Sequence, residues 1–441
     1  MRPAWLILTS SYFRYVCINL LIMIREAIIQ KLLFIVQKWL TLIVIICNSF
    51  ILSAQAPLKP FPQHVKYFTG AIKPSHISQT QLDNAVRDFY TLWKKRFIKN
   101  VPGKPESYVW FENTGKKQCV SEGQGYGMII VALMAGFDPS AKITYDKLFR
   151  YYKAHPDRRS KYLMAWAQYT NGKSSDETSA TDGDMDIAYS LLLADKQWGS
   201  KGPINYLQAG RDMIADIMQL EINHKTWSVL LCDGVEHDSK DYFDMRSSDF
   251  MPAHFKAFQQ ATNDGRWNKV IDANYKLFSS LQGNYSPDAG LIPDFISHIN
   301  TKAKPARPHF LESVYDGEYN YNACRNPWRI ATDYLLTGDK RSKNIADKIN
   351  RWIKETTNND PNNLSAGYTL AGHDIKGRHF EALSFIAPFA VSAMVDRKNQ
   401  AWLNRVWDYT VAFKLKDFDY YDNTIKLLDM IIISGNYWEP R

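Results

Sequence analysis

The sequence reads TDGDMDIAYSLLLA at residues 181–194. Three aspartates at alternate positions, Asp182, Asp184 and Asp186, precede an apolar run that predicts a helix over residues 187–198. We expect Asp182 and Asp184 at the mouth of that helix, where they would hydrogen-bond ligand hydroxyl groups, and Asp186 as its cap. A purely structural role for all three, as caps and loop hydrogen bonds, is the alternative. A calcium loop is disfavoured, because Tyr189 stands where its glutamate ligand would be required.

An upstream stretch reads SEGQGYGM at residues 121–128 and places one glutamate, Glu122, among three glycines before an apolar run that predicts another helix. Glycines allow a backbone to approach a ligand closely. A glutamate near the start of a partly apolar helix can have its pKa raised by burial, as a general acid working near neutral pH requires. Glu122 is therefore a candidate general acid, and the alternative is that it only caps its helix.

Around these motifs the chain is mostly helical and is interpreted as one domain over residues 57–441. A helical core stripe comes first, formed by Leu82, Val86, Phe89, Trp93 and Phe97. Further helices are predicted over residues 187–198, 204–220, 252–262, 267–281, 344–354, 380–395 and 402–413. Strand alternation is scarce, and no stretch is typical of a flexible linker. The sequence therefore predicts an all-α protein.

Residues 1–56 have the pattern of a secretory signal peptide. Lys31 and Lys38 precede a short apolar run at residues 39–50, which leads into the small-residue site Ala54-Gln55-Ala56. Met23 is a possible true start, because the whole pattern lies after it. We expect cleavage after Ala56, a secreted or periplasmic protein, and no stable membrane association afterwards; a retained anchor is the alternative.

Charge and cysteine usage exclude several other classes of protein. The formal net charge is +9, but five of the basic residues and one acidic residue lie in residues 1–56. The remainder has no basic block interleaved with aromatic residues, so nucleic acid is not an expected partner. Cys119, Cys232 and Cys324 have no paired spacing, and the ten histidines show no zinc motif. We expect no metal and no cofactor, and a monomer.

The two motifs, in this order, resemble those of glycoside hydrolase family 8. Residues 181–194, followed by Gln197 and Trp198, resemble the family signature, and residues 121–128 resemble its general-acid segment. The resemblance continues through residues 59–62, 163–166, 246–249, 321–327 and 435–440. It implies an (α/α)6 barrel with a single catalytic domain, whose inner-helix loops form an open cleft for a β-1,4-linked polysaccharide.

The resemblance also implies an inverting mechanism with a separate catalytic base. One branch of the family has an aspartate base where this chain has Asn322, and an amide cannot take a proton from water. In the chitosanase and lichenase branch, which shares that asparagine, the base is a glutamate in the preceding insertion, and Glu312 stands at the matching place. Asp316 and Glu318 are the competing candidates.

We therefore predict three catalytic residues, Glu122 as acid, Glu312 as base and Asp182 to hold the distorted sugar. Predicted substrate contacts are Trp166, Asp184, Tyr126, Asp249 and Arg325. Trp166 matches a sugar-stacking position, and Arg246, Asp249, Arg325 and Arg329 are interpreted as a fixed polar network under the cleft.

The expected activity is endo-hydrolysis of β-1,4 linkages in chitosan or in β-glucans such as lichenan and cellulose. Chitosan is polycationic, so its cleft should be acidic, and we expect Asp182, Asp184, Asp233, Glu236 and Asp249 to enrich the cleft in carboxylates. Residues 231–236, however, lack the aromatic platform expected for a chitosanase. A xylanase of the same family and a non-catalytic carbohydrate-binding barrel are the alternatives.

Overall fold

The computed structural model describes residues 5–50, 56–111, 116–171 and 178–440. The chain divides into two compact units, Met1–Ala56 and Pro57–Arg441. The first unit contains α1 (Trp5–Phe50), and the apolar side chains of residues 15–40 that the structure describes are exposed. Most of the predicted cleavage motif lies outside the described residues. Within the described part of the chain, no helix combines the length and the apolar composition needed to cross a membrane.

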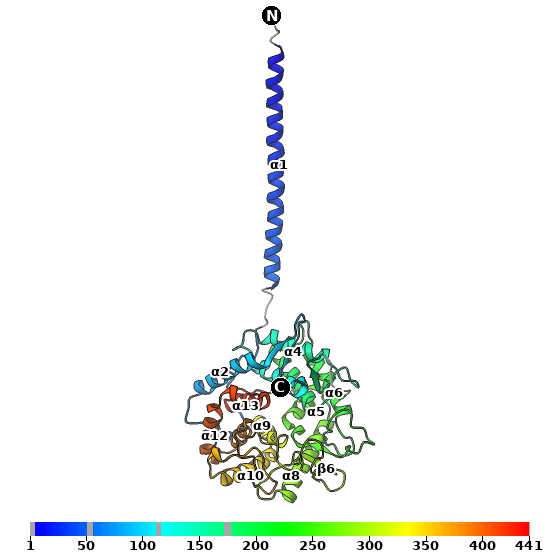
Figure 1. The fold of residues 1–441 in the computed structure, drawn as a ribbon, viewed down its shortest axis with the longest axis vertical. Coiled ribbons are helices and arrows are strands. Elements are labelled where there is room, and N and C mark those ends of the chain that lie inside the picture. Colours follow the sequence, from blue (N-terminus) through cyan, green and yellow to red (C-terminus); the bar gives the residue numbers. More distant parts are fainter. Residues whose placement is uncertain (1–4, 51–55, 112–115, 172–177, 441) are drawn as a thin grey trace. The chain divides into compact units, whose positions relative to one another are not determined.

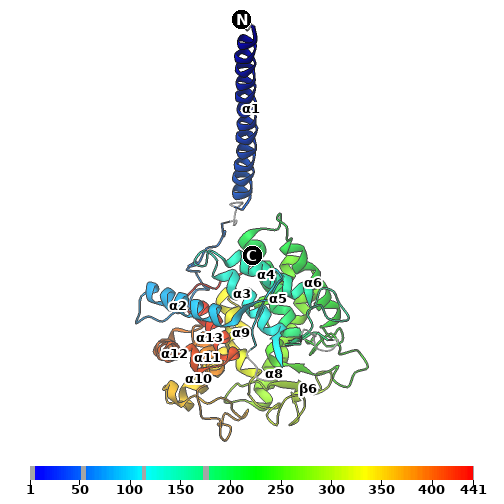
Figure 2. The same cartoon turned by 45° about the horizontal axis from the view of Figure 1, so that its top comes forward.

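The second unit is an (α/α)6 barrel, as predicted. In its described residues twelve α-helices alternate between an outer and an inner ring. The inner helices are α3 (Ser121–Leu133), α5 (Thr181–Trp198), α7 (Pro252–Thr262), α9 (Asn326–Thr337), α11 (Leu383–Ala393) and α13 (Tyr420–Ile433). Each inner helix contacts the next, and α13 contacts α3, which closes the ring. In Figures 1 and 2 these helices lie in the centre of the unit.

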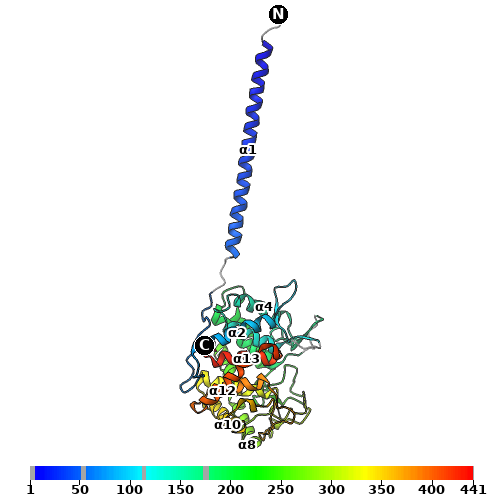
Figure 3. The same ribbon diagram turned by 60° about the vertical axis from the view of Figure 1, so that its left-hand side comes forward.

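The outer helices surround this ring and differ from it in sequence pattern. They are α2 (Gln79–Phe97), α4 (Ala141–Ala154), α6 (Tyr206–Leu220), α8 (Arg266–Tyr285), α10 (Lys340–Thr356) and α12 (Gln400–Ala412). Figure 3 shows several of them following one another around the side of the barrel. Each buries one face only, as in α2, whose predicted stripe from Leu82 to Phe97 is buried. By contrast, α3, α5, α11 and α13 are buried on nearly all sides.

Two details of the sequence interpretation are wrong. The helix predicted to begin at Ile187 begins at Thr181, so Asp186 lies inside α5 and does not cap it. The glycines of residues 121–128 and Gly183 serve helix packing and not the approach of a ligand. A Cβ atom on Gly183 would lie 2.6 Å from the Glu122 nitrogen, and one on Gly125 would lie 2.7 Å from the Asp186 Cβ. The glycines therefore allow α3 and α5 to cross closely enough to bring both motifs to one place.

Among the described residues, three small antiparallel sheets lie between the helices. β1 (Ile98–Asn100) pairs with β2 (Ser107–Val109). β3 (Lys117–Val120) pairs with β4 (Ala167–Tyr169), with Val120 opposite Ala167. β6 (Phe295–Ser297) pairs on one side with β5 (Met245–Arg246) and on the other with β7 (Lys304–Pro305). Because β3 runs directly into α3 and β5 ends at Arg246, these strands determine where Glu122 and Arg246 lie.

Candidate active site

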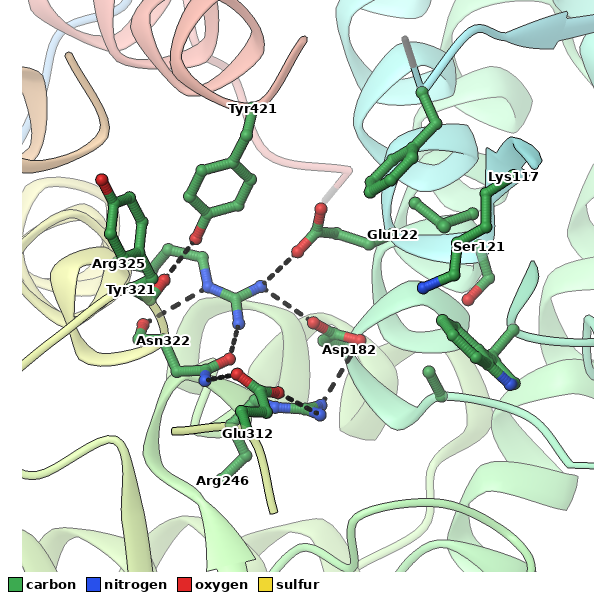
Figure 4. A pocket seen from close by; sticks show the side chains of 14 residues that line it. Lys117, Ser121, Glu122, Asp182, Arg246, Glu312, Tyr321, Asn322, Arg325 and Tyr421 are labelled. Carbon is green, nitrogen blue, oxygen red and sulfur yellow. Dashed lines mark hydrogen bonds and ion pairs between the residues drawn. The ribbon is translucent and has the colours of Figure 1, made fainter. Parts of the chain in front are cut away.

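A pocket of about 320 Å3 lies where β3, the first turns of α3 and α5, and the segment before α9 meet. Its lining combines aromatic, acidic and basic side chains. The lining residues are Phe111, Lys117, Val120, Ser121, Glu122, Trp166, Ala180, Asp182, Arg246, Glu312, Tyr321, Asn322, Arg325 and Tyr421. Figure 4 shows the Arg325 guanidinium between Glu122, Asp182 and Asn322. All three predicted catalytic residues therefore line one pocket.

Glu122 lies in the first turn of α3 with its side chain 17% exposed. Its carboxyl accepts hydrogen bonds from the Arg325 Nη1, at 2.8 Å, and from the Tyr420 hydroxyl, at 3.1 Å. Burial raises the pKa of Glu122 to about 7; the Arg325 guanidinium opposes this rise, and the Asp182 carboxylate adds to it. Such a carboxyl is protonated in an appreciable fraction of molecules at neutral pH, as a general acid must be.

Asp182 lies close to Glu122 but in the opposite electrostatic situation. Burial alone would raise its pKa, but the Arg246 and Arg325 guanidiniums outweigh burial and lower the pKa of Asp182. Its Oδ2 accepts from the Arg325 Nη1 at 2.8 Å, and its Oδ1 accepts from the Gly183 N–H at 2.9 Å. The Arg246 Nη1 lies 3.8 Å from the same Oδ1. Asp182 is therefore held ionised beside a carboxyl that can carry a proton.

Glu312 reaches the pocket from the loop between β7 and α9, and its side chain is 44% exposed. Its Oε2 accepts a hydrogen bond from the Asn322 Nδ2 at 2.8 Å, and its Oε1 lies 3.6 Å from the Arg246 Nη2. Asn322 in turn accepts from the Arg325 Nη2 at 3.0 Å. Asn322 and Arg325 thus connect Glu312 to Glu122 without a direct contact between the two carboxyl groups (Figure 4).

The competing carboxylates near Glu312 are engaged with backbone groups. Asp316 is fully buried and accepts from the backbone N–H groups of residues 311, 312 and 313, at 2.7–2.9 Å. Glu318 accepts from the Leu370 N–H at 2.7 Å. Neither residue lines the pocket. Both carboxyl groups support the loops around the site, which leaves Glu312 as the one of the three that faces the pocket.

The other predicted substrate contacts divide into two groups. Trp166 and Arg325 line the pocket, and Tyr126 lies directly beneath it, where its hydroxyl accepts from the Arg325 Nη1 at 3.1 Å. Asp184 and Asp249 are fully buried and do not line the pocket. Asp184 accepts from the Met164 N–H at 2.9 Å, and Asp249 lies 3.6 Å from the Arg246 Nη1.

Of the five carboxylates predicted to enrich the cleft, only Asp182 lines this pocket. Arg329 lies deeper in the polar network. It holds Asp186 through two hydrogen bonds of 2.9 and 2.6 Å, and His254 contacts the same carboxylate at 2.9 Å.

Several residues at the site have no local signal in the sequence. Lys117 lines the pocket from β3, and Tyr420 contacts Glu122 across 298 positions of the chain. Asp294 is buried and accepts from the N–H groups of residues 320, 322 and 323, at 2.7–3.1 Å, so it positions Asn322. Burial raises the pKa of Asp294 to about 7, although these N–H groups oppose the rise. Only the pairing of distant segments brings these residues to the site.

The pocket therefore offers a protonatable carboxyl, a second, half-exposed carboxyl, and an ionised aspartate fixed by two arginines. Aromatic rings on its wall provide faces for the apolar C–H surfaces of a sugar. Among the described residues, no group of three or more His, Cys, Asp or Glu side chains is arranged to hold a metal ion. The carboxyl groups of the pocket are suited to acid–base chemistry.

Comparisons with known proteins agree with this geometry. The model of glycosyl hydrolases family 8 matches residues 60–435. A β-glucanase of Niallia circulans is 46% identical over 400 residues, which cover 89% of this chain and 95% of that protein. An endoglucanase of Bacillus sp. (strain KSM-330) is 42% identical, covering 90% of this chain and 85% of that protein.

A solved structure extends the agreement to three dimensions. The apo structure of a β-1,3-1,4-glucanase from Paenibacillus sp. X4 superposes with a TM-score of 0.83 at 47% identity, covering 87% of this chain and all of that one. The family match spans the whole barrel and includes both motifs that meet in the pocket. The chain belongs to glycoside hydrolase family 8 and is a glycosidase.

Proposed function

We propose that this protein is an inverting endo-glycosidase that hydrolyses β-1,4 linkages in β-glucans. The observation that carries the proposal is the pair Glu122 and Glu312, which line one pocket in different environments. Glu122 is buried with its pKa raised to about 7, whereas Glu312 lines the same pocket and is half exposed. Inverting glycosidases require such a pair, separated by roughly 6.5–9.5 Å to leave room for a water molecule.

In the proposed mechanism Glu122 transfers its proton to the glycosidic oxygen as the bond from that oxygen to C1 breaks. A water molecule attacks C1 from the opposite face, and Glu312 takes the proton that this water loses. One product carries a new reducing end with inverted configuration, and the other regains a free hydroxyl group. Asp182, held by Arg325 and Arg246, stabilises the positive charge that develops on the sugar ring.

The substrate class rests on the relatives and on the charge of the pocket. The relatives at 42–47% identity are named a β-glucanase, an endoglucanase and a β-1,3-1,4-glucanase. The lining has three basic side chains, Lys117, Arg246 and Arg325, and three acidic ones, Glu122, Asp182 and Glu312. A pocket with balanced charge suits a neutral polymer better than polycationic chitosan. Lichenan and mixed-linkage β-glucan are therefore the proposed substrates.

The proposal is tested by reducing-end release from lichenan, carboxymethyl-cellulose, chitosan and xylan by the purified full chain. We expect hydrolysis of lichenan, with the initial product shown by NMR to have the α configuration. Glu312→Gln should abolish this activity. Glu318→Gln is the matched control, because Glu318 lies outside the pocket and the glutamine oxygen can still accept the hydrogen bond from the Leu370 N–H. Full activity in Glu312→Gln would refute the choice of base. If the wild type released no reducing ends from any of the four polymers, the alternative of a non-catalytic carbohydrate-binding barrel would be favoured.

We also propose that residues 1–56 form an export signal that is cleaved after Ala56. The division into compact units falls at this position, and the family match begins at residue 60. The apolar side chains described in α1 are exposed, so this segment lacks a packed core of its own. N-terminal sequencing of the protein released by an expressing bacterium should begin at Pro57. A released or cell-bound protein that retains α1 would refute cleavage.

A further inference from the structure

Lys117 is a charged residue of the pocket that the proposed mechanism does not use. It lies in β3 on the wall formed with Trp166 and Phe111. Its Nζ lies 4.2 Å from the centroid of the Trp166 ring and 5.9 Å from that of Phe111. Figure 4 shows the Lys117 side chain extending into the pocket from the side opposite Asn322. A sugar ring that stacks on Trp166 therefore comes into contact with the ammonium group or takes its place.

The other two cations of the pocket are compensated by carboxylates. Arg325 contacts Glu122 and Asp182, and Arg246 lies within 4.0 Å of Asp182 and Glu312. Within the described part of the chain, Lys117 has no carboxylate at ion-pair distance; its Nζ lies over two aromatic rings, and the Glu312 carboxylate acts on it only from farther away. When Glu122 is protonated for catalysis, the lining has more positive than negative groups. The uncompensated charge is then located at Lys117.

From this arrangement we propose that Lys117 determines substrate specificity, by favouring neutral β-glucan over polymers of glucosamine. This inference rests on the proposed function and names the substrate feature that the same site rejects. An ammonium group on a sugar stacked at Trp166 would lie within a few ångströms of the Lys117 ammonium, in a pocket partly shielded from water. A glucan hydroxyl group at the same place would accept a hydrogen bond from Lys117. Specificity would thus arise from repulsion of the wrong substrate as well as attraction of the right one.

Lys117 also lies near enough to Glu312 to influence it. Burial lowers the pKa of Lys117, and the Glu312 carboxylate opposes this effect. A change at Lys117 could therefore alter the rate of hydrolysis for every substrate. Comparing differently charged polysaccharides with the same variant removes this common effect, because the catalytic groups are identical for all of them.

The experiment uses the full chain, as wild type and as Lys117→Met, at pH 5.5 and low ionic strength. We would measure kcat/KM on neutral lichenan and on anionic carboxymethyl-cellulose, and the inhibition of lichenan hydrolysis by the cationic glucosamine tetramer. In Lys117→Met the inhibition constant of the tetramer should fall about tenfold, equivalent to about 1.4 kcal/mol. The ratio of activity on carboxymethyl-cellulose to that on lichenan should fall severalfold. Lys99→Met is the matched control, because Lys99 lies 5.1 Å over Trp110 outside the pocket.

An inhibition constant that changes less than twofold in Lys117→Met, or equally in Lys99→Met, would overturn the inference. A salt titration of the wild type provides a second test, which does not depend on whether the Lys117→Met variant folds. Added salt should strengthen inhibition by the tetramer relative to a neutral cello-oligosaccharide, because it screens the repulsion; weakened inhibition would contradict the proposal. If the wild type cleaved neither lichenan nor carboxymethyl-cellulose, the proposed function would be refuted. This outcome differs from an unchanged inhibition constant, which would overturn only the role of Lys117.

Discussion

Replacing Glu122 with glutamine removes the proposed acid while leaving the shape of the site unchanged. In the wild type, Arg325 donates a hydrogen bond of 2.8 Å to Glu122, and the amide oxygen of the variant can still accept it. The amide nitrogen can donate to the Tyr420 hydroxyl. The barrel should therefore remain folded. We expect kcat on lichenan to fall about 10²–10⁴-fold, the usual contribution of a positioned general acid.

The pKa of Glu122 gives a second, independent prediction, the size of the change in kcat/KM with pH. With a pKa of about 7, the carboxyl is protonated in about 0.9 of the molecules at pH 6 and in about 0.1 at pH 8. The wild-type kcat/KM should therefore fall about tenfold between these two pH values, since the protonated form is the active one. In Glu122→Gln, kcat/KM should not show this decrease between pH 6 and pH 8, because the glutamine side chain does not titrate.

The assay compares lichenan with an aryl β-glycoside whose leaving group departs without protonation. Glu122→Gln should lose less than tenfold on the aryl glycoside, because the acid is not needed there. Glu355→Gln, at an exposed position of α10, is the matched control. Equal losses on both substrates would refute the role of Glu122 as acid. More than a tenth of wild-type activity on lichenan would refute it as well.

Three further perturbations test the structure around the site. Gly183→Ala should lower the free energy of unfolding by about 1–3 kcal/mol, because the added Cβ would lie 2.6 Å from the Glu122 nitrogen. Gly283→Ala in α8 is the control and should raise the free energy of unfolding slightly, because its added Cβ would meet nothing within 4 Å. Thermal denaturation measures both variants. Asp316→Asn should lower kcat/KM on lichenan about tenfold with little change in melting temperature, because it weakens the hydrogen bonds that position the loop of Glu312. Glu221→Gln should reduce the loss of stability that accompanies a rise in pH from 4.5 to about 8, because burial raises the pKa of Glu221 from 4.5 to about 8.

The sign of the last prediction follows from proton linkage. Between pH 4.5 and about 8 the folded state keeps the proton on Glu221 and the unfolded state releases it, so the free energy of unfolding falls as pH rises. The slope is at most about 1.4 kcal/mol per pH unit for this group. Chemical denaturation at pH 6 and pH 8.5 measures the difference. Identical pH dependence in wild type and variant would contradict the assignment.

Part of the site was predictable because its residues belong to short motifs. Glu122 and Asp182 lie in the two motifs, and their helices follow from local apolar patterns. Resemblance to the family, more than periodicity, predicted the closed barrel. The start of α5 was misplaced because its first two turns contain three buried aspartates, and the burial of one of them, Asp186, depends on Arg329 from another helix.

Neighbouring residues in the sequence do not show which of three carboxylates near residue 315 faces the pocket. Glu312, Asp316 and Glu318 lie within seven positions of one another, and only the resemblance to the family, not a local pattern of residues, favoured Glu312. Folding directs Asp316 toward the N–H groups of its own loop and Glu318 toward Leu370, which leaves Glu312 facing the pocket. Hydrogen-bond geometry in three dimensions made this distinction.

From the amino-acid sequence came the helical class of the protein, the resemblance to the family, and the prediction of Glu122 and Asp182 as site residues. The tertiary structure alone decided which charges meet. Arg325 reaches Glu122 across 203 positions of the chain, and Lys117 reaches Trp166 through the pairing of β3 with β4. The physical reason is that helix formation depends on neighbours a few residues apart, whereas a pKa or a preference for one sugar depends on charges brought together by packing.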